Sequence, residues 1–222
     1  LKDVIPFDEQ QIQISAIIDG KKITINKSRE KKLVLIDGKK ISSNSLLSQI
    51  LPTQIISPDR GFVVGGSPKL KRSYLDWGVF HNNEKTLETY VSYKKTLKNI
   101  NSLLVSGNKN QLREWLTKFA SLSVEITKER NDYIGELTKT LSKNLSHKLK
   151  SLVGSSFEFG FVLQTGWPKE VDALSEKKIE TYLLNNINTF FKSKYLSYGP
   201  HRSSIDYFLN NQSENFLSRG EQ

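Results

Sequence analysis

A long stretch without proline constrains the fold more than any other feature of this sequence. Between Pro68 and Pro168 there is no proline, and apolar residues recur every three or four positions, which is the period of an amphipathic helix. The repeat is interrupted at Ser106-Gly107-Asn108 and then continues to Leu149. Because long helices joined by a short turn lie antiparallel, the pattern predicts a helical arm. The apolar stripe is wide, which favours a compact bundle over a free coiled coil.

The first sixty residues follow the period of a β-strand instead. Apolar and polar residues alternate before and after Asp19-Gly20, and again around Asp37-Gly38. An Asp-Gly pair between alternating runs indicates a tight hairpin, because such a turn needs positive φ angles. The sequence therefore predicts a meander of about four antiparallel strands. A short helix over 45–49 and a buried strand over 51–57 are expected to follow.

Two more strands and one helix are predicted beyond the helical stretch. Aromatic and apolar residues alternate with other residues over 157–164, which indicates a strand with one aromatic face. Thr165-Gly166-Trp167-Pro168 ends that strand, and an apolar stripe at helical spacing predicts a helix over 175–194. A second alternating strand over 205–209 is expected to end at Asn210-Asn211.

The last six residues, Leu217-Ser218-Arg219-Gly220-Glu221-Gln222, resemble the signature turn of an ABC-type ATPase. In such a turn a serine hydroxyl and a glycine N–H stand at the start of a helix, where free N–H groups and the helix dipole favour phosphate. An ordinary helix start with Ser218 as N-cap explains the same residues. Because the sequence contains no G-x-x-x-x-G-K-S/T loop, it is expected to be the middle of a larger ATPase with one half of a composite nucleotide site.

The order of these elements predicts an α/β fold in which a helical arm interrupts an ATPase head. We expect part of an ABC-type ATPase head, made of an antiparallel β meander plus core strands, with an inserted antiparallel helical arm domain. Residues 1–72 would form the N-terminal part of the head without its phosphate loop, 73–195 the arm, and 196–222 the return to the head, ending in the signature motif.

Composition limits the class of function. Lys and Arg exceed Asp and Glu by 33 − 23 = 10, and the pI is about 9.6, which favours a polyanionic partner, nucleic acid before membrane. A Lys-rich proteome explains the same surplus. The absence of cysteine excludes disulfides, thiolate metal sites and cysteine nucleophiles. No apolar run is long enough for a membrane helix, and a cytoplasmic protein is expected.

Six sequence blocks together resemble the bacterial DNA repair family RecF. In chain order they are 51–59 (LPTQIISPD), 65–69 (GGSPK), 71–81 (KRSYLDWGVFH), 166–168 (GWP), 198–202 (YGPHR) and 217–220 (LSRG). They stand in the family's order and cover the whole chain. The resemblance implies an ABC-type head related to the SMC proteins, with an inserted helical domain. It also implies ATP with Mg²⁺ as cofactors, an ATP-dependent homodimer, and binding of single- and double-stranded DNA at gaps.

The resemblance further implies a role in recombinational repair, replication restart and the SOS response, together with recombination mediator proteins. The family's Walker A loop would lie before Leu1 and its Walker B strand after Gln222. We therefore expect a weak ATPase in the full-length relative and no hydrolysis of ATP by this chain alone.

The resemblance also assigns roles to residues of the nucleotide site. Ser218, Arg219 and Gly220 fall on the signature motif and would contact the ATP held by the partner protomer. Asp59 follows a predicted strand and is the candidate catalytic residue in the loop near Mg²⁺ and water. Turn chemistry explains Asp59 as well. No metal ligand is assigned within the chain itself.

Basic residues are the candidates for DNA contact. Lys69, Lys71 and Arg72 open a predicted helix and could touch DNA phosphates, although a solvated helix face explains them equally. Arg202 could pair with a phosphate or carboxylate in bidentate fashion, whereas a structural hydrogen bond is expected for His201. The aromatic and basic residues interleaved over 90–98 suit single-stranded DNA, but an amphipathic helix explains them too.

Two functions from different classes remain open. The first is a RecF-type ATP-dependent DNA-binding protein of which this chain is an internal segment. The alternative is a non-enzymatic basic helical module that binds DNA or a protein partner by charge alone, with salt-sensitive binding that is indifferent to nucleotide.

Overall fold

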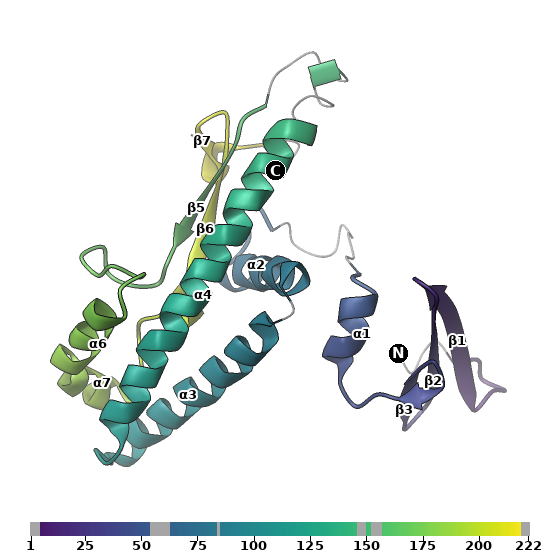
Figure 1. Ribbon diagram of the computed structural model, residues 1–222, viewed down its shortest axis with the longest axis horizontal. Helices are drawn as coiled ribbons and strands as arrows, with labels where there is room; N and C mark the ends of the chain where they lie inside the picture. Colours follow the sequence, from purple (N-terminus) through teal and green to yellow (C-terminus); the bar gives the residue numbers. More distant parts are fainter. Residues whose placement is uncertain (1–4, 54–62, 84, 146–149, 152–156, 219–222) are drawn as a thin grey trace. The chain divides into compact units, whose positions relative to one another are not determined.

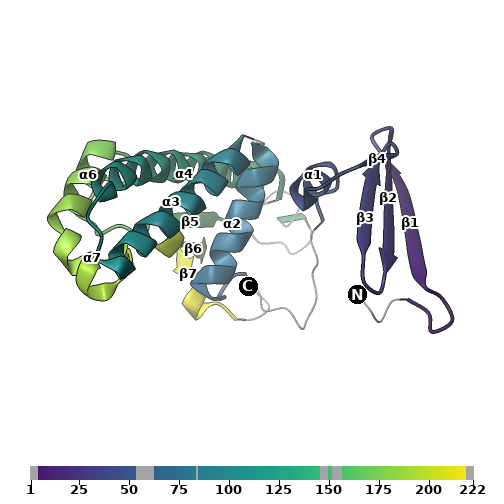
Figure 2. The same ribbon diagram turned by 90° about the horizontal axis from the view of Figure 1, so that it is seen from below.

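The computed structural model describes residues 5–53, 63–83, 85–145, 150–151 and 157–218. The chain divides into two compact units, residues 1–57 and 58–222. Figures 1 and 2 show that the first unit is a small sheet with one helix, and that the second combines long helices with a second sheet.

The first unit is the predicted meander. Its sheet has four antiparallel strands in the order β1-β2-β3-β4, namely β1 (Gln11–Ile18), β2 (Lys21–Ser28), β3 (Lys32–Ile36) and β4 (Lys39–Lys40). Asp19 and Gly20 have φ angles of 49° and 76°, and Asp37 and Gly38 have 49° and 78°. Both residues of each turn therefore take the left-handed conformation that a tight hairpin requires, which confirms the two predicted hairpins.

The core of this unit is small. Ile5, Ile23 and Val34 are buried, whereas Ile14 and Ile17 on the edge strand β1 are 56% and 76% exposed. Helix α1 (Asn44–Ile50) follows the sheet, and the Oγ of its N-cap Ser43 accepts from the N–H of Ser45 at 3.2 Å. Residues 51–53 of the strand predicted over 51–57 are not in a strand, and the remainder lies outside the described residues.

The second unit contains an antiparallel sheet of three strands in the order β5-β6-β7, namely β5 (Phe159–Gln164), β6 (Ser204–Leu209) and β7 (Gln212–Ser213). In the register of the first two strands, Phe161 lies opposite Tyr207 and Leu163 opposite Ile205, so their large apolar residues share one face. Helices α2 (Pro68–Asn82) and α4 (Leu112–Thr140) pack on the sheet and enclose a core with these strands (Figure 1).

The predicted helical arm is a compact bundle. Helix α3 (Thr86–Ser106) ends at Gly107, whose φ of 73° gives a left-handed C-cap, and α4 returns antiparallel beside it. Helices α6 (Glu176–Asn185) and α7 (Ile187–Ser193) complete the bundle. Its largest fully buried side chains include Phe119 and Phe190, so the wide apolar stripe is used for packing between several helices.

Two predicted helices differ in extent from the observed ones. The helix predicted over 175–194 is broken at Asn186, whose side-chain Nδ2 donates to the carbonyl oxygen of Tyr182 at 2.9 Å. An Asn side chain that bonds the backbone in this way competes with the helix. Helix α4 ends at Thr140 and is followed by a π-helical turn, Leu141–Leu145, and residues 146–149 of the predicted helix lie outside the described residues.

The structure confirms the predicted mixed α/β class. Strand β5 falls within residues 73–195, the expected arm, and pairs with β6 from residues 196–222, the expected return. The assignment of 1–72, 73–195 and 196–222 to head, arm and return stays a prediction.

Candidate functional site

The segment that leads to Ser218 is tied to the start of α2. It begins with the short 3₁₀ helix η4 (Glu214–Phe216), in which Glu214 is only 2% exposed. One carboxylate oxygen of Glu214 accepts from the N–H of Gly65 at 2.6 Å, and the other forms an ion pair with the ammonium group of Lys71. The charge of a buried carboxylate is costly unless it is paired in this way.

Most of the predicted nucleotide site lies outside the described residues. Ser218 is described and exposed, four residues after Glu214, whereas Asp59, Arg219 and Gly220 are not described. The roles predicted for these four residues stay predictions. The structure shows that Glu214, four residues before Ser218, is held in place by Lys71 and Gly65.

A second cluster of polar groups surrounds the loop between α7 and β6. This loop contains the 3₁₀ turn η3 (Pro200–Arg202). Arg130 of α4, 3% exposed, donates from Nη1 to the carbonyl oxygen of Pro200 at 3.0 Å and to the Oγ of Ser203 at 2.7 Å. A guanidinium group with five fixed donors can hold several acceptors at once, so Arg130 fixes the course of the loop.

The same guanidinium group joins α4 to the other two long helices. Its Nη2 lies 2.8 Å from Asp76 Oδ1 on α2, and its Nε donates to that oxygen at 2.9 Å. Tyr90 of α3 donates to Asp76 Oδ1 at 2.6 Å and accepts from Arg130 Nε at 3.2 Å. Burial raises the pKa of Tyr90, so its hydroxyl stays protonated and can donate. Arg130 thus connects three helices with one loop.

His201 has the structural role that the sequence predicted. Its Nδ1 lies 2.8 Å from the hydroxyl of Tyr93, and its Nε2 lies 3.1 Å from the carbonyl oxygen of Leu196. A carbonyl oxygen needs a donor, so Nε2 carries the proton and Nδ1 accepts from Tyr93. Burial, together with the charges of Arg202 and two further arginines, lowers the pKa of His201 to about 4, which keeps the ring neutral.

Two glycines allow the loop to lie against the end of β5. The N–H of Gly199 donates to the carbonyl oxygen of Gly166 at 3.0 Å. Gly166 has a φ of 83°, and a Cβ placed on it would lie 2.2 Å from the carbonyl oxygen of Gly199. Only glycine permits both this φ and this close approach of two backbones.

The structure separates the basic residues that the sequence grouped together. Lys69 and Arg202 are exposed, and the guanidinium group of Arg202 lies over the ring of Tyr195, 5.6 Å from its centroid. Arg72 is half-buried and donates from Nη1 to the carbonyl oxygen of Ser203 at 2.6 Å, so it lies beside the residue that follows Arg202. Lys71 differs from the prediction, because its ammonium group is buried against Glu214.

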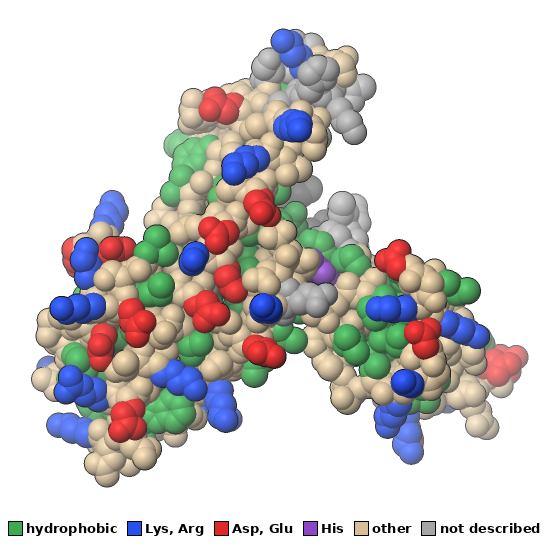
Figure 3. All heavy atoms as spheres, in the orientation of Figure 1, with side chains coloured by type: hydrophobic (Ala, Val, Ile, Leu, Met, Phe, Trp, Pro, Cys, Tyr) green, Lys and Arg blue, Asp and Glu red, His purple; other side chains and the backbone are tan. Residues whose placement is uncertain are grey.

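The tyrosines of α3 are not available for stacking with bases. Tyr93 is 4% exposed within the bundle, and the hydroxyl of Tyr90 is hydrogen-bonded to Asp76 and Arg130. The lysines at positions 94, 95 and 98 are exposed. The segment 90–98 is therefore an amphipathic helix with a basic outer face. On the face shown in Figure 3, Lys and Arg side chains are spread over both units with acidic side chains among them.

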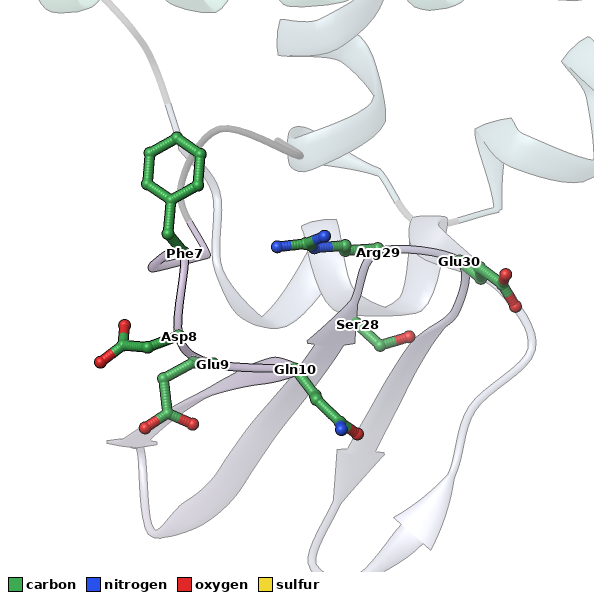
Figure 4. Close-up of a pocket in the computed structure, with 7 residues that line it drawn as sticks. All are labelled: Phe7, Asp8, Glu9, Gln10, Ser28, Arg29 and Glu30. Atoms are coloured by element: carbon green, nitrogen blue, oxygen red, sulfur yellow. The ribbon is translucent and has the colours of Figure 1, made fainter.

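A shallow hollow of about 400 Å³ in the first unit carries no recognisable site. It is lined by exposed or half-buried residues before β1, at the end of β2 and between β2 and β3: Phe7, Asp8, Glu9, Gln10, Ser28, Arg29 and Glu30. Their side chains do not converge on a common point (Figure 4). Among the described residues there is no group of three or more His, Cys, Asp or Glu that could hold a metal ion, and no helix long and apolar enough to span a membrane.

Sequence reasoning missed Arg130 and Glu214, the two residues that organise these clusters. Arg130 carries a readable signal, because it occupies a buried position on the apolar stripe of α4, four residues from both Ile126 and Ile134. A charge at such a position needs a partner. Glu214 has no comparable signal, because its partner Lys71 is remote in the sequence and belongs to a different element.

No family model matches the chain. A solved structure of the recombination mediator protein RecF with ATP, of the RecFOR pathway, superposes with a TM-score of 0.75 at 26% identity, over 99% of this chain and 61% of that one. The fold is therefore that of part of an ABC-type ATPase with inserted helices.

Curated relatives indicate which proteins of this class the chain resembles. The DNA replication and repair protein RecF of Pseudomonas syringae pv. tomato is 30% identical over 100% of this chain and 60% of its own length. RecF of Hahella chejuensis is 29% identical over 91% of this chain and 55% of its own length. These similarities support the predicted resemblance of the chain to a partial RecF segment. It spans about 55–60% of the length of these relatives.

Proposed function

We propose that this chain is part of a RecF-type recombination mediator that binds ATP and DNA in recombinational repair and replication. The observation that carries the proposal is the similarity to RecF proteins over the whole chain. The anchoring of Glu214, four residues before Ser218, supports it, because a signature turn must be held in a fixed place to meet a nucleotide.

In this proposal the signature residues act across a dimer interface. Ser218 donates to the γ-phosphate of ATP held by the partner protomer, and Arg219 and Gly220 complete the turn. Asp59 would be the residue that acts near Mg²⁺ and the attacking water. ATP then stabilises a homodimer, because one protomer supplies the phosphate loop and the other supplies the signature turn.

The DNA contact in this proposal is made by the exposed cations. Lys69 and Arg202 contact phosphates of single- and double-stranded DNA at gaps. Arg72 supports Arg202, because it donates to the carbonyl oxygen of Ser203, the next residue in the chain. Lys71 is not retained as a DNA contact, because its ammonium group is buried in an ion pair. Cooperation with mediator proteins, a part in the SOS response and a cytoplasmic location belong to the same proposal.

The experiment that tests this function replaces Ser218 by alanine in the full-length protein. We expect ATP-driven dimerisation, measured by sedimentation, to be lost while ATP binding to the monomer is retained. Ser121→Ala is the matched control, because Ser121 is an exposed serine of α4. Normal dimerisation of Ser218→Ala would overturn the signature assignment.

The exposed lysines of α3 favour a second candidate, a basic helical module without ATPase function. It predicts DNA binding that weakens with salt and is the same with and without ATP. DNA binding by the full-length protein, measured across a salt series with and without ATP, separates the two functions. Tighter, dimeric binding with ATP supports the RecF-type function.

A further inference from the structure

We propose that Lys71 is a positioning residue for the signature turn, and that it acts through its buried ion pair with Glu214. The pair fixes the start of segment 214–218 to the first turns of α2. This inference rests on the proposed function, since it deepens the role of Ser218.

Glu214 is held from three directions. Lys71 pairs with one carboxylate oxygen, and Gly65 donates its N–H to the other at 2.6 Å. The N–H of Tyr207 on β6 lies 3.5 Å from the first oxygen. The carboxylate therefore has partners from the turn before α2, from α2 itself and from the sheet, and it cannot shift without breaking several of them.

The partners of Glu214 are themselves fixed. Helix α2 begins with the N-cap Ser67, whose Oγ accepts from the N–H of Leu70 at 3.3 Å. The preceding turn is closed by the bond from Gly66 N–H to the carbonyl oxygen of Val63 at 3.1 Å. Gly65 has a φ of 72°, a left-handed conformation that favours glycine, and its N–H donates to the carboxylate.

Burial determines what the ion pair between Lys71 and Glu214 contributes. The side chains of Lys71 and Glu214 are 9% and 3% exposed. Replacing such a pair by apolar residues is often neutral for stability, whereas removing one partner leaves a buried charge. The pair therefore contributes little to overall stability, but it holds segment 214–218 in one place.

The distance along the chain is short enough for this fixation to matter. Ser218 lies four positions after Glu214, so an extended chain between them spans at most about 14 Å. Helix α2 also carries Arg72, which donates to Ser203, and Asp76, which accepts from Arg130. The same helix therefore holds both segment 214–218 and the loop before β6 in position.

The test compares Lys71→Met with Lys71→Arg in the full-length protein. Methionine keeps most of the length of the side chain and removes the charge, whereas arginine keeps the charge. For Lys71→Met we expect amide hydrogen exchange in peptides covering 210–218 to become about tenfold faster, while exchange in the bundle core is unchanged. The protein concentration needed for half-maximal ATP-driven dimerisation should rise about tenfold, because the turn is less often in place. Lys71→Arg should restore both values.

Lys178→Met is the matched control. Lys178 pairs with Asp172 at 3.5 Å, but these side chains are 64% and 48% exposed, so this variant should change neither readout. If Lys71→Met does not fold, Glu214→Gln is the second variant, because the amide oxygen still accepts from Gly65 while the charge is removed. The same faster exchange and weaker dimerisation are expected.

The two readouts separate this inference from the proposed function. Unchanged exchange over 210–218 in a folded Lys71→Met variant overturns the positioning role, whatever the dimerisation result. Failure of the wild-type protein to dimerise with ATP overturns the proposed function, and the exchange measurement then still decides whether Lys71 fixes the segment.

Discussion

The guanidinium group of Arg130 on α4 holds the carboxylate of Asp76 on α2, with Nη2 2.8 Å and Nε 2.9 Å from the same oxygen. The two side chains differ in exposure, because that of Arg130 is 4% exposed and that of Asp76 is 30% exposed. Arg130 also donates to Pro200 and Ser203. The pair therefore links the packing of the helices to the course of the loop before β6.

The burial of Arg130 predicts the cost of removing the carboxylate that it holds. Asp76→Ala leaves a buried guanidinium charge without its carboxylate and should lower the free energy of unfolding by about 3–5 kcal/mol. Asp76→Asn keeps a side-chain oxygen that can accept from Arg130, and should cost less. Denaturant unfolding of both variants measures the difference. Asp172→Ala, which breaks an exposed pair, is the control and should cost less than about 1 kcal/mol. A loss for Asp76→Asn as large as that for Asp76→Ala would contradict the argument.

Gly166 should tolerate no side chain. In Gly166→Ala the new Cβ would lie 2.2 Å from the carbonyl oxygen of Gly199 and 2.8 Å from the backbone nitrogen of Ser203, and the φ of 83° disfavours alanine as well. We expect a loss of several kcal/mol in thermal or denaturant unfolding.

Gly135→Ala is the matched control for Gly166→Ala. Gly135 lies within α4, and a Cβ there meets nothing within 4 Å. Alanine should therefore stabilise the helix by up to about 1 kcal/mol. Equal stability of the two alanine variants would show that the approach of Gly166 to Gly199 does not constrain the fold.

The parts of the fold that could be predicted from sequence are those set by local pattern. The turns at Asp19-Gly20 and Asp37-Gly38 have the positive φ angles that their residues favour. The alternation over 157–164 and 205–209 gave two strands whose apolar faces match in register. The turn at Gly107 separates two helices as its composition indicates. In each case the residues that decide the structure are neighbours in the sequence.

The parts that could not be predicted depend on contacts between remote residues. Lys71 was grouped with Lys69 and Arg72 because they are adjacent in the sequence, but a helix turns by about 100° per residue and sends neighbours in different directions. Lys71 is thereby directed to a buried carboxylate, and Arg72 to Ser203. The predicted residues Asp59, Arg219 and Gly220 lie outside the described residues, and their roles stay predictions.

His201 should make the protein less stable in mild acid. Its pKa is lowered from 6.5 to about 4 in the folded chain by burial and by the charges of Arg202, Arg72 and Arg130, while Tyr93 and Leu196 satisfy the neutral ring. The unfolded state therefore binds more protons between these pKa values, so stability falls as pH falls through this window. Between pH 7 and pH 5 the contribution of His201 should fall by about 2 kcal/mol.

Unfolding at several pH values, with His201→Gln as the comparison, checks this prediction. Glutamine can donate to Leu196 and accept from Tyr93, but it does not titrate. The variant should therefore lose less stability than the wild-type protein between pH 7 and pH 5. Parallel pH dependence of the two proteins would show that the ring of His201 is not kept neutral by its surroundings.

Lys69 and Arg202 should each contribute one phosphate contact to DNA binding by the full-length protein. Each exposed cation that neutralises a phosphate releases a counterion, so the slope of log K against log salt should become less steep by about 0.9 on duplex DNA when either is replaced by glutamine. The double variant should lose about twice that slope, because the two residues act independently. Loss of affinity should be similar for different DNA sequences, because phosphate contacts carry no sequence information. Lys178→Gln, which removes an exposed lysine elsewhere, should leave the slope unchanged. An unchanged slope for Lys69→Gln and Arg202→Gln would remove both residues from the DNA interface.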